Sequence, residues 1–297
     1  MLSTLDPGSP AARRGLSDIS IRNLFIVPTI AFLIVFNIFP LIYSLGYSFT
    51  DFRASFNAPA NFVGLQNYRD LLNDEHVWNN FSVTAKYVLV SVGGQVLVGF
   101  GVAMLLNRKI PFKGLITTLL LLPMMMSMVV VGLFWELLYS PSWGIVDYAL
   151  GLEGFDWLSN PNVALYAIAI TDIWMWSPFV MLLCLAGLSA IPQHLYEAAA
   201  IDRASRWYTF TRITLPLVTP LLLIAIIFRT MEAFKTFDLA FIMSTQETTE
   251  LIAIKLYRLA FQEWQTGPSC ALAYMVLIMV LAITNIYVKY LNRAKER

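Results

Sequence analysis

Six long apolar segments constrain what this chain can fold into more than any other feature. They lie near residues 23 to 49, 83 to 106, 114 to 139, 163 to 190, 218 to 243 and 269 to 290. Each is long enough, as a helix, to cross a hydrocarbon core of about 30 Å. The residues are 58% hydrophobic and 13% charged, which indicates a membrane protein. The stretches between the segments are too short for a soluble domain. We predict an all-α integral membrane protein with six transmembrane helices.

The first apolar segment resembles a signal peptide only in its position. It is too long, and too poor in small residues that would mark a cleavage site, to be removed. We therefore expect it to remain as a membrane span. Residues 1–20 mix Pro, Gly, Ser and Arg, which predicts a mobile tail, and residues 21–297 are predicted to form a single transmembrane domain.

Lys and Arg are distributed unevenly between the loops, which predicts the orientation of the chain. Basic residues are retained on the cytoplasmic side of a membrane. The N-terminal tail, the second-to-third loop, the fourth-to-fifth loop and the C-terminus together hold thirteen Lys and Arg, whereas the opposite loops hold four. Both termini are therefore predicted to be cytoplasmic.

Two shorter stretches have apolar residues at helical spacing but cannot span a membrane. They are FVGLQNYRDLL and TELIAIKLYRLAFQEW, in the first and last loops on the predicted outer side. We expect a short amphipathic helix in each, lying on the outer face.

The residues that usually build disulfides and metal centres form no such pattern here. Cys184 and Cys270 both lie in apolar segments, where a free thiol behaves as a small hydrophobe. His76 and His194 are far apart in sequence and lie on opposite predicted sides. We expect no disulfide, no metal site and no catalytic His pair. The net charge of +1 gives no reason to expect a nucleic-acid partner.

Asp172 is an ionisable residue well inside the fourth apolar segment, roughly 13 Å deep at about 1.5 Å per residue. A carboxylate at that depth is costly and marks a candidate functional site. At about 100° per residue, Asp172, Trp176 and Phe179 share one helix face. An acid beside aromatic rings suits a sugar, because hydroxyls bond the acid and C–H faces pack on the rings. The alternative is a buried Asp paired with another helix and a Trp that fills the core.

The fifth apolar segment carries Arg229, Glu232, Lys235 and Asp238, each three residues from the last. Steps of three residues wrap the series around half the helix. Arg229 and Glu232, with Ala233 and Thr236, lie within about 100° of one another and are candidates for lining a transport path. Lys235 and Asp238 point elsewhere, and we expect them to form a structural ion pair nearer the outer end. A purely structural network through all four charges is the alternative.

A polar island, EAAAIDRASRWYTFTRITLPLVTP from Glu197 to Pro220, separates the fourth and fifth apolar segments. Pro192 suits a first helical turn, and the alanines after Glu197 favour continuation of that helix to Asp202. A second helical piece follows from Arg206. The pattern predicts a short helical hairpin within residues 191–217, facing the cytoplasm.

This island resembles the cytoplasmic loop of the permease subunits of binding-protein-dependent ABC importers, which reads EAA, then Gly, then I-x-LP. Those places are held by Glu197, Ala198, Ala199, Ile213, Leu215 and Pro216. The segments FVGLQNYRDLL, LYEAAAIDRAS and FRTMEAFKTFD resemble the carbohydrate branch, of the maltose and glycerol-phosphate transporter type. The resemblance covers nearly the whole chain.

The resemblance implies a type I importer permease domain in the plasma (inner) membrane of a prokaryote. Its partners would be a second permease, two copies of a cytoplasmic ATPase that bind ATP and Mg, a periplasmic or extracellular solute-binding protein, and lipid. The chain itself would bind no cofactor and catalyse no reaction. The residues implied in coupling to the ATPase are Glu197, Ala198, Ala199, Asp202, Arg203, Ile213, Leu215 and Pro216. Those implied in the path of a sugar or sugar derivative are Asp172, Trp174, Trp176, Phe179, Arg229, Glu232, Ala233 and Thr236.

Two positions depart from the family pattern. Arg203 stands where the family usually has Gly, and a non-Gly residue in a left-handed turn costs about 1–2 kcal/mol. Either the turn is less tight, or Arg203 accepts the strain while it contacts the ATPase. The Gly-rich turn often found after the FD of the fifth segment is replaced by Ser244 to Glu247, which leaves the shape of that outer loop open.

A motif that is absent from the sequence also bears on function. No Lys is preceded by Gly, so the chain lacks the phosphate-cradling loop G-x4-G-K-[ST]. It cannot supply its own ATPase by that route. The rival interpretations are a secondary transporter, with Asp172, Glu232 and Lys235 as an ion relay, and a stand-alone channel. Neighbouring genes for an ATPase and a solute-binding protein would favour the importer.

Overall fold

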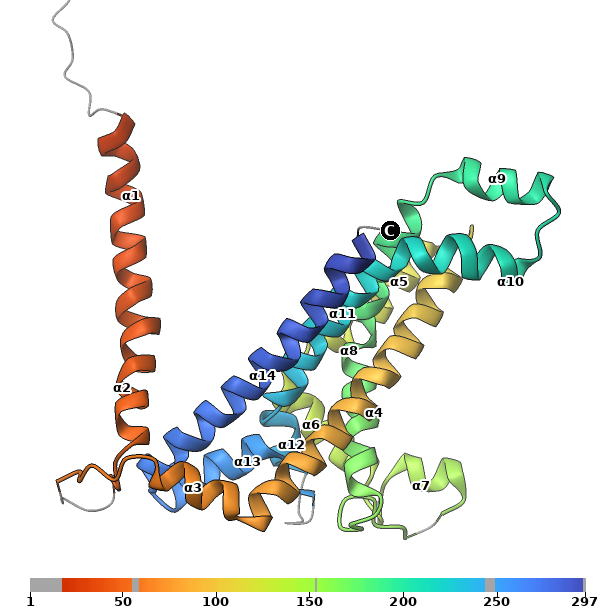
Figure 1. Ribbon diagram of the computed structural model, residues 1–297. Coiled ribbons are helices and arrows are strands. Elements are labelled where there is room, and N and C mark those ends of the chain that lie inside the picture. Colours follow the sequence, from red (N-terminus) through yellow and green to blue (C-terminus); the bar gives the residue numbers. More distant parts are fainter. Residues whose placement is uncertain (1–17, 55–58, 153, 244–248, 296–297) are drawn as a thin grey trace, which may run out of the picture.

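The computed structural model describes residues 18–54, 59–152, 154–243 and 249–295. Within those ranges the chain is helical, and its only β-type pairing is an isolated bridge between Thr50 and Phe62. The helices shown in Figure 1 are α1 Asp18–Leu33, α2 Phe39–Ser48, α3 Gln66–Asn73, α4 Glu75–Leu106, α5 Lys113–Leu121, α6 Met128–Leu138, α7 Ile145–Leu150, α8 Ala164–Ser189, α9 Gln193–Ile201, α10 Arg206–Thr209, α11 Leu215–Phe234, α12 Asp238–Met243, α13 Ile252–Tyr257 and α14 Thr266–Lys295. Short π-helical turns join α1 to α2 and α10 to α11.

Among the described residues, five continuous helices are long and apolar enough to cross a membrane. They are Arg22–Ser48, Glu75–Leu106, Ala164–Ser189, Arg206–Phe234 and Thr266–Arg293. Each contains most of a segment expected from the sequence. The described residues are thus all-helical, as predicted, whereas the count of six spans and the cytoplasmic placement of the termini stay predictions.

The third apolar segment is interrupted, which the hydropathy pattern did not indicate. Pro123 begins a single 3-10 turn, and Met126 and Ser127 have extended backbones before α6 begins. Proline has no N–H to donate and its ring clashes with the preceding turn, so an α-helix seldom continues through it. The segment is therefore two short helices, α5 and α6, instead of one continuous helix.

The fifth apolar segment is displaced toward the N-terminus from its predicted range. A π-helical turn, Phe210–Thr214, joins α10 to α11 without a break, so the second arm of the polar hairpin is the beginning of the membrane helix. At the other end α11 stops at Phe234, and a separate helix, α12, begins at Asp238. The last charges of the segment consequently lie at a break in the helix.

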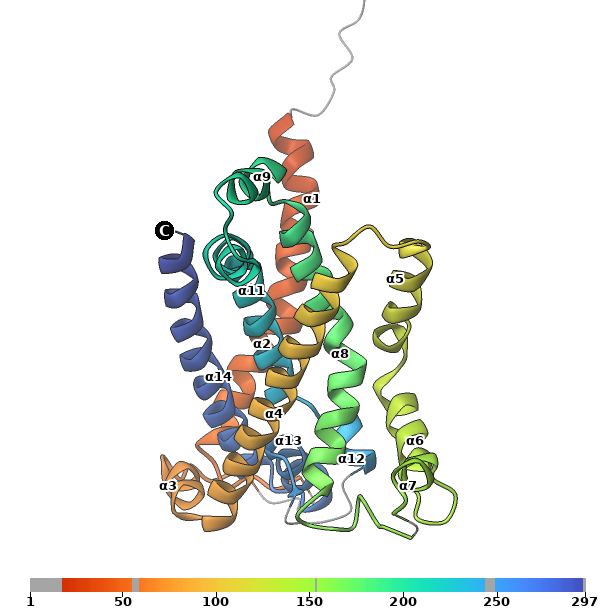
Figure 2. The same ribbon diagram turned by 90° about the vertical axis from the view of Figure 1, so that its right-hand side faces the viewer.

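The centre of the molecule is built by α4, α8 and α11 (Figure 2). Glycine allows α4 and α8 to approach closely. A Cβ placed on Gly99 would lie 2.6 Å from the backbone oxygen of Ser177, and one on Gly94 would meet the side chain of Ile173. This close approach holds the polar face of α4 against α8.

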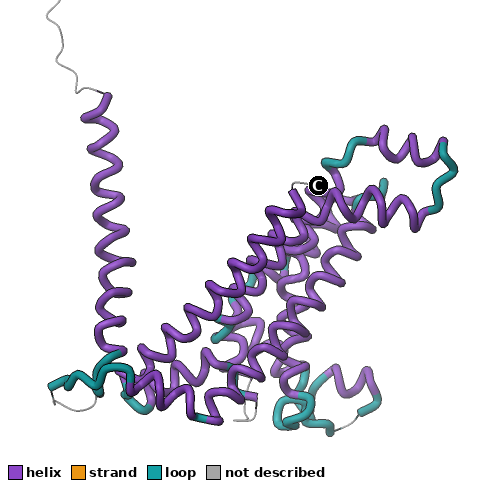
Figure 3. Tube along the Cα trace, viewed as in Figure 1, coloured by secondary structure: helices purple, strands orange, loops and turns teal. Residues whose placement is uncertain are grey.

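Loops and short helices gather at the two ends of the bundle (Figure 3). The hairpin of α9 and α10 projects from one end, and α3, α7, α12 and α13 lie at the opposite end (Figure 1). The short helices expected in FVGLQNYRDLL and TELIAIKLYRLAFQEW are present as α3 and α13. Ser244 to Glu247, the replaced outer turn, lies outside the described residues.

The first membrane helix stands apart from the others (Figure 1). None of the apolar window between Arg22 and Ser48 is buried within this chain. Its attachment is at the α2 end, where Tyr274 of α14 donates a hydrogen bond to the backbone oxygen of Leu41. The helix therefore has an apolar surface that no other part of the described chain covers.

Candidate functional site

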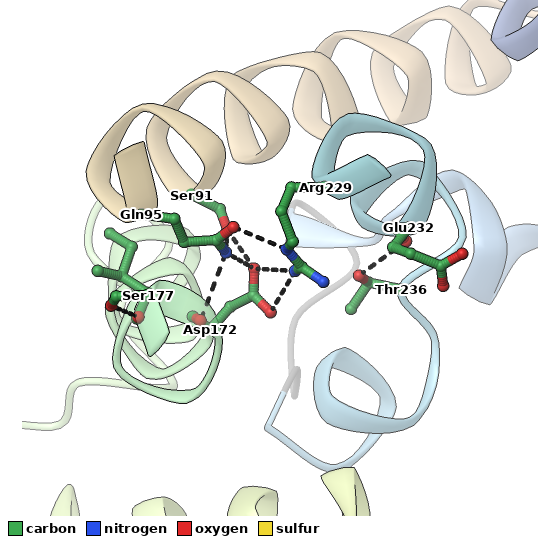
Figure 4. Close-up of polar contacts among 8 residues, drawn as sticks. Ser91, Gln95, Asp172, Ser177, Arg229, Glu232 and Thr236 are labelled. Carbon is green, nitrogen blue, oxygen red and sulfur yellow. Dashed lines mark hydrogen bonds and ion pairs between the residues drawn. The ribbon is translucent and has the colours of Figure 1, made fainter. Parts of the chain in front are cut away.

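Asp172 is the centre of a polar cluster inside the helix bundle (Figure 4). Its side chain is only 3% exposed and forms an ion pair with Arg229 of α11, from Nη2 to Oδ1 at 3.4 Å. It also accepts hydrogen bonds from Ser91 Oγ and, at 2.7 Å, from Gln95 Nε2. A buried charge is tolerable when it is paired and hydrogen-bonded. The structure thus shows the alternative raised by the sequence, a buried Asp paired with another helix.

Arg229 is enclosed as completely as its partner. Its side chain is 3% exposed, and its Nε donates to Gln95 Oε1 at 2.8 Å. Its Cζ lies 4.4 Å from the centre of the Trp176 ring, within the range of a cation–π interaction. The α8 helix therefore contributes both the counter-charge, Asp172, and the ring of Trp176 that covers the Arg229 guanidinium of α11.

Ser91 and Gln95 are site residues that the sequence reading missed. Both are fully buried on α4 and are four residues apart, so they lie on one helix face. Tyr87, one turn further along that face, is also fully buried. A signal was present, because polar side chains at four-residue intervals are unusual in an apolar span. Mean hydropathy does not reveal this pattern, because one polar residue per helical turn barely lowers the average over the segment.

The aromatic residues predicted for a sugar path are only partly brought together. The Phe179 ring lies 6.5 Å from that of Phe228 on α11. Trp174, however, lies on the opposite side of α8 from Asp172, since two residues rotate by about 200°. It packs against Trp135 at 5.7 Å and lines an apolar cavity of about 600 Å³ beside α4, α5 and α8. Trp174 is therefore not part of the polar cluster around Asp172.

Glu232 and Lys235 form a second ion pair, at the end of α11. Lys235 Nζ lies 2.9 Å from Glu232 Oε1, and the two side chains are 57% and 53% exposed, respectively. The expected pair of Lys235 with Asp238 is therefore wrong. Lys235 follows the last residue of α11, so a side chain three positions earlier remains beside it, whereas Asp238 begins a separate helix. Thr236 donates to the backbone oxygen of Glu232 at 3.4 Å, and Ala233 is buried.

The polar hairpin contains a strained turn at the position that departed from the family pattern. Arg203 has φ of 53°, in the left-handed region that favours glycine. The N–H of Ala204 donates to Ala199 O at 2.9 Å, and that of Arg203 to Ala200 O at 3.1 Å. These are the two hydrogen bonds of a Schellman motif, which ends a helix tightly. The explanation by a less tight turn is thus excluded.

The residues implied in ATPase coupling divide between two parts of the hairpin. Glu197 and Ala198 are exposed on α9, Ala199 is buried there, and Asp202 is exposed directly after the helix. Ile213, Leu215 and Pro216 lie where the second arm enters α11. Ser205 begins that arm, because its Oγ accepts a hydrogen bond from the N–H of Tyr208 at 3.1 Å. The hydroxyls of Tyr196 and Thr214 meet at 3.1 Å and tie the arms together.

A metal site would need several donor side chains close together in the part of the chain that the structure describes. There, no three His, Cys, Asp or Glu side chains are close enough to hold an ion. Cys184 is a free, buried thiol and Cys270 a free, half-buried one. The two charged clusters and the hairpin therefore remain the candidate functional features.

Comparison with known proteins identifies a family of similar chains. Residues 95–297 match the family described as binding-protein-dependent transport system inner membrane component. The trehalose/maltose transport system permease protein MalF of Thermococcus litoralis is 34% identical, with 90% of this chain and 92% of that protein aligned. The sulfoquinovosyl glycerol transport system permease protein SmoG of Agrobacterium fabrum is 30% identical, over 93% of this chain and 92% of its own.

A solved structure has the same arrangement of helices. It is a bacterial ABC transporter involved in the import of the acidic polysaccharide alginate. The TM-score is 0.78 at 23% identity, and the alignment covers 92% of this chain and 95% of the other. At that identity, the likeness shows the fold alone.

Proposed function

This chain belongs to the family of binding-protein-dependent transport system inner membrane components, and we propose that it forms part of the path through which an ATP-driven importer moves a sugar or sugar derivative. A periplasmic or extracellular solute-binding protein delivers the sugar, and two copies of a cytoplasmic ATPase bind ATP and Mg. One observation carries the proposal. The buried ion pair joins α8 to α11 inside the bundle, and the hairpin of α9 and α10 connects the same two helices in the chain.

The shape and surface of the hairpin support its role as the contact with the ATPase. The turn between α9 and α10, which contains Arg203, projects from the end of the bundle (Figure 1). Ile201 and Trp207 on either side of it are 81% and 73% exposed. Large apolar side chains gathered on a projecting element are typical of a protein interface. A groove of the ATPase that covers them would push or pull directly on α8 and α11.

Two uncovered surfaces support a second permease as partner. The first membrane helix buries none of its apolar window in this chain. Glu232 and Lys235 are more than half exposed at the end of a membrane helix, and charged side chains there face water or protein in preference to lipid. A second permease would complete a path on that side, with Trp176, Phe179 and Glu232 on this chain's wall.

The polar cluster pairs its one cation with one anion, which bears on the charge of the sugar. Asp172 already neutralises Arg229, so the cluster does not demand an anionic substrate. The relatives are consistent with this, because one is named for trehalose and maltose and another for a sulfonated sugar derivative. We propose a sugar whose hydroxyls bond Glu232 and Thr236 and whose apolar face packs on Trp176.

Reconstitution distinguishes the importer from its rivals. We expect the chain, with its second permease, ATPase and solute-binding protein in liposomes, to take up radiolabelled trehalose or maltose only when ATP is present. Uptake by the chain alone, driven by an ion gradient without ATP, would refute the proposal. The relay required by a secondary transporter lacks support, because Asp172 contacts Arg229 and Gln95, whereas Glu232 and Lys235 contact each other.

A hairpin variant tests the contact with the ATPase separately. Glu197→Lys reverses a charge that is exposed on α9, so we expect the ATPase to copurify less with the permease. Leu97→Ala on the outward face of α4, where Leu97 is 77% exposed, is the control and should leave copurification unchanged. If the ATPase copurifies equally with the natural permease, Glu197→Lys and Leu97→Ala, a role for Glu197 is excluded.

A further inference from the structure

The amide of Gln95 joins both members of the buried ion pair. Its Oε1 accepts from Arg229 Nε at 2.8 Å, and its Nε2 donates to Asp172 Oδ2 at 2.7 Å. The same Nε2 lies 2.9 Å from Ser91 Oγ. An amide is the side-chain group that can accept from a guanidinium at one end and donate to a carboxylate at the other. Gln95 is the link between the two charges (Figure 4).

The direct contact between the charges is weaker than the contacts through Gln95. Arg229 Nη2 lies 3.4 Å from both oxygens of Asp172, whereas charge-assisted N–H···O bonds are about 2.7–2.9 Å long. Both bonds to Gln95 fall within that range. The polar connection between α8 and α11 that has the shortest individual hydrogen bonds therefore runs through Gln95, a side chain of α4.

The packing of α4 explains why this link has mechanical weight. Gly99 leaves no room for a Cβ between α4 and Ser177 of α8, so these two helices cannot separate without breaking a close backbone contact. Near the hairpin, α11 meets α8 through Leu221, whose side chain would lie 2.9 Å from a Cβ on Gly187. Deeper in the bundle, the polar attachment of α11 to the other two helices is the cluster around Gln95.

We propose that Gln95 is a positioning residue that makes α4, α8 and α11 move as one body when the hairpin is displaced. The inference rests on the proposed function, because the hairpin is taken to receive the movement of the ATPase. Without the amide, α11 can shift relative to α8, and displacement of the hairpin no longer reaches the side of the path that bears Glu232. ATP is then hydrolysed with less sugar moved.

The experiment measures ATP hydrolysed per sugar taken up by the complete complex in liposomes, together with the melting temperature of the permease pair. We expect Gln95→Leu to raise the ratio by about threefold or more, which lies within the range of coupling energies measured for contacting residues. Asn80→Leu is a matched control. Asn80 is also a buried amide of α4, but it donates to the backbone oxygen of Glu250, at 2.8 Å, away from α11. That variant should lower the melting temperature without changing the ratio.

An exchange of groups separates positioning from mere packing. Gln95→Glu places two carboxylates beside Arg229, and Asp172→Asn leaves the guanidinium without a counter-charge, so each should raise the ratio. In the double variant one carboxylate and one amide again surround Arg229, which still donates to both, and the hydrogen bond between positions 95 and 172 can form with its direction reversed. We expect the double variant to return to within about twofold of the natural ratio.

Three results would overturn the inference. These are an unchanged ratio in Gln95→Leu, an equal rise in Asn80→Leu, and a double variant no better than its parents. Failure of the proposed function is distinguishable, because the natural complex itself would then take up no sugar with ATP.

Discussion

The two ion pairs of α11 have the same chemistry and opposite surroundings. The pair of Lys235 with Glu232 is the shorter, 2.9 Å against 3.4 Å for Arg229 with Asp172. It is also the more exposed, since its side chains are more than half accessible and those of the inner pair are 3% accessible. Exposed pairs contribute roughly 0–1 kcal/mol, whereas breaking a buried pair costs about 3–5 kcal/mol.

The N–O distance within an ion pair therefore does not indicate how much that pair contributes to stability, because the shorter pair is the more exposed one. The outer charges lose little when separated, because water solvates each of them. The inner charges have no such replacement, so each depends on its neighbours from three helices. The inner pair is suited to holding helices together, and the outer pair to exchanging partners with a passing molecule.

The largest expected effect comes from removing one inner charge. Arg229→Met leaves the Asp172 carboxylate buried without a cation and should lower the free energy of unfolding by about 3–5 kcal/mol. The measurement is thermal unfolding of the purified permease pair in detergent. Combining it with Asp172→Val removes both charges, and the double variant should be more stable than either parent. A double variant as unstable as the sum of its parents would contradict the importance of pairing.

The next effect tests how closely α4, the helix that carries Gln95, packs on α8. Gly99→Ala puts a Cβ 2.6 Å from Ser177 O, and overpacking of this kind costs about 1–3 kcal/mol. Gly101→Ala is the control, because a Cβ there would meet nothing within 4 Å and alanine favours the helix. Unfolding temperatures of the two variants should change in opposite directions. Equal stability of both would mean that the α4 and α8 contact is not tight.

A third basic residue, Arg203, extends the comparison to a charge that is exposed and lies in a strained turn. Arg203→Gly should relieve about 1–2 kcal/mol of strain in the left-handed turn and therefore stabilise the hairpin against proteolysis. If the side chain contacts the ATPase, docking measured by copurification will weaken at the same time. Arg206→Ala removes a charge on α10 without affecting the turn and serves as the control. Unchanged docking and transport in Arg203→Gly would exclude a special contact.

The smallest effect on stability is expected at the outer pair. Glu232→Gln should change the free energy of unfolding by no more than about 1 kcal/mol, because both side chains are solvated in this chain. Sugar uptake should nevertheless fall, since the variant removes an acceptor from the proposed path. A large drop in unfolding temperature, with uptake preserved, would reverse the assignment of the two pairs.

Much of the architecture and part of the site could be predicted from the sequence. The apolar segments, the hairpin and the choice of Asp172 and Arg229 as candidates follow from patterns within each segment. The interruption at Pro123 was also visible as a residue, but membrane helices can tolerate proline when neighbours satisfy the freed groups. Ser91 and Gln95 were missed because their significance lies in what α4 faces. Lys235 was paired with the wrong acid because α11 ends one residue before it.

The membrane class, the position of the hairpin and the family could all be predicted without a structure. These depend on lengths of apolar chain, on local helix and turn preferences and on a motif, all of which are properties of neighbouring residues. Which charges are partners depends instead on how the helices pack. The close crossing of α4 and α8 brings Gln95 between Asp172 and Arg229, residues 77 and 134 positions away from it in the chain. Contacts over such separations depend on how helices pack, which no local pattern contains.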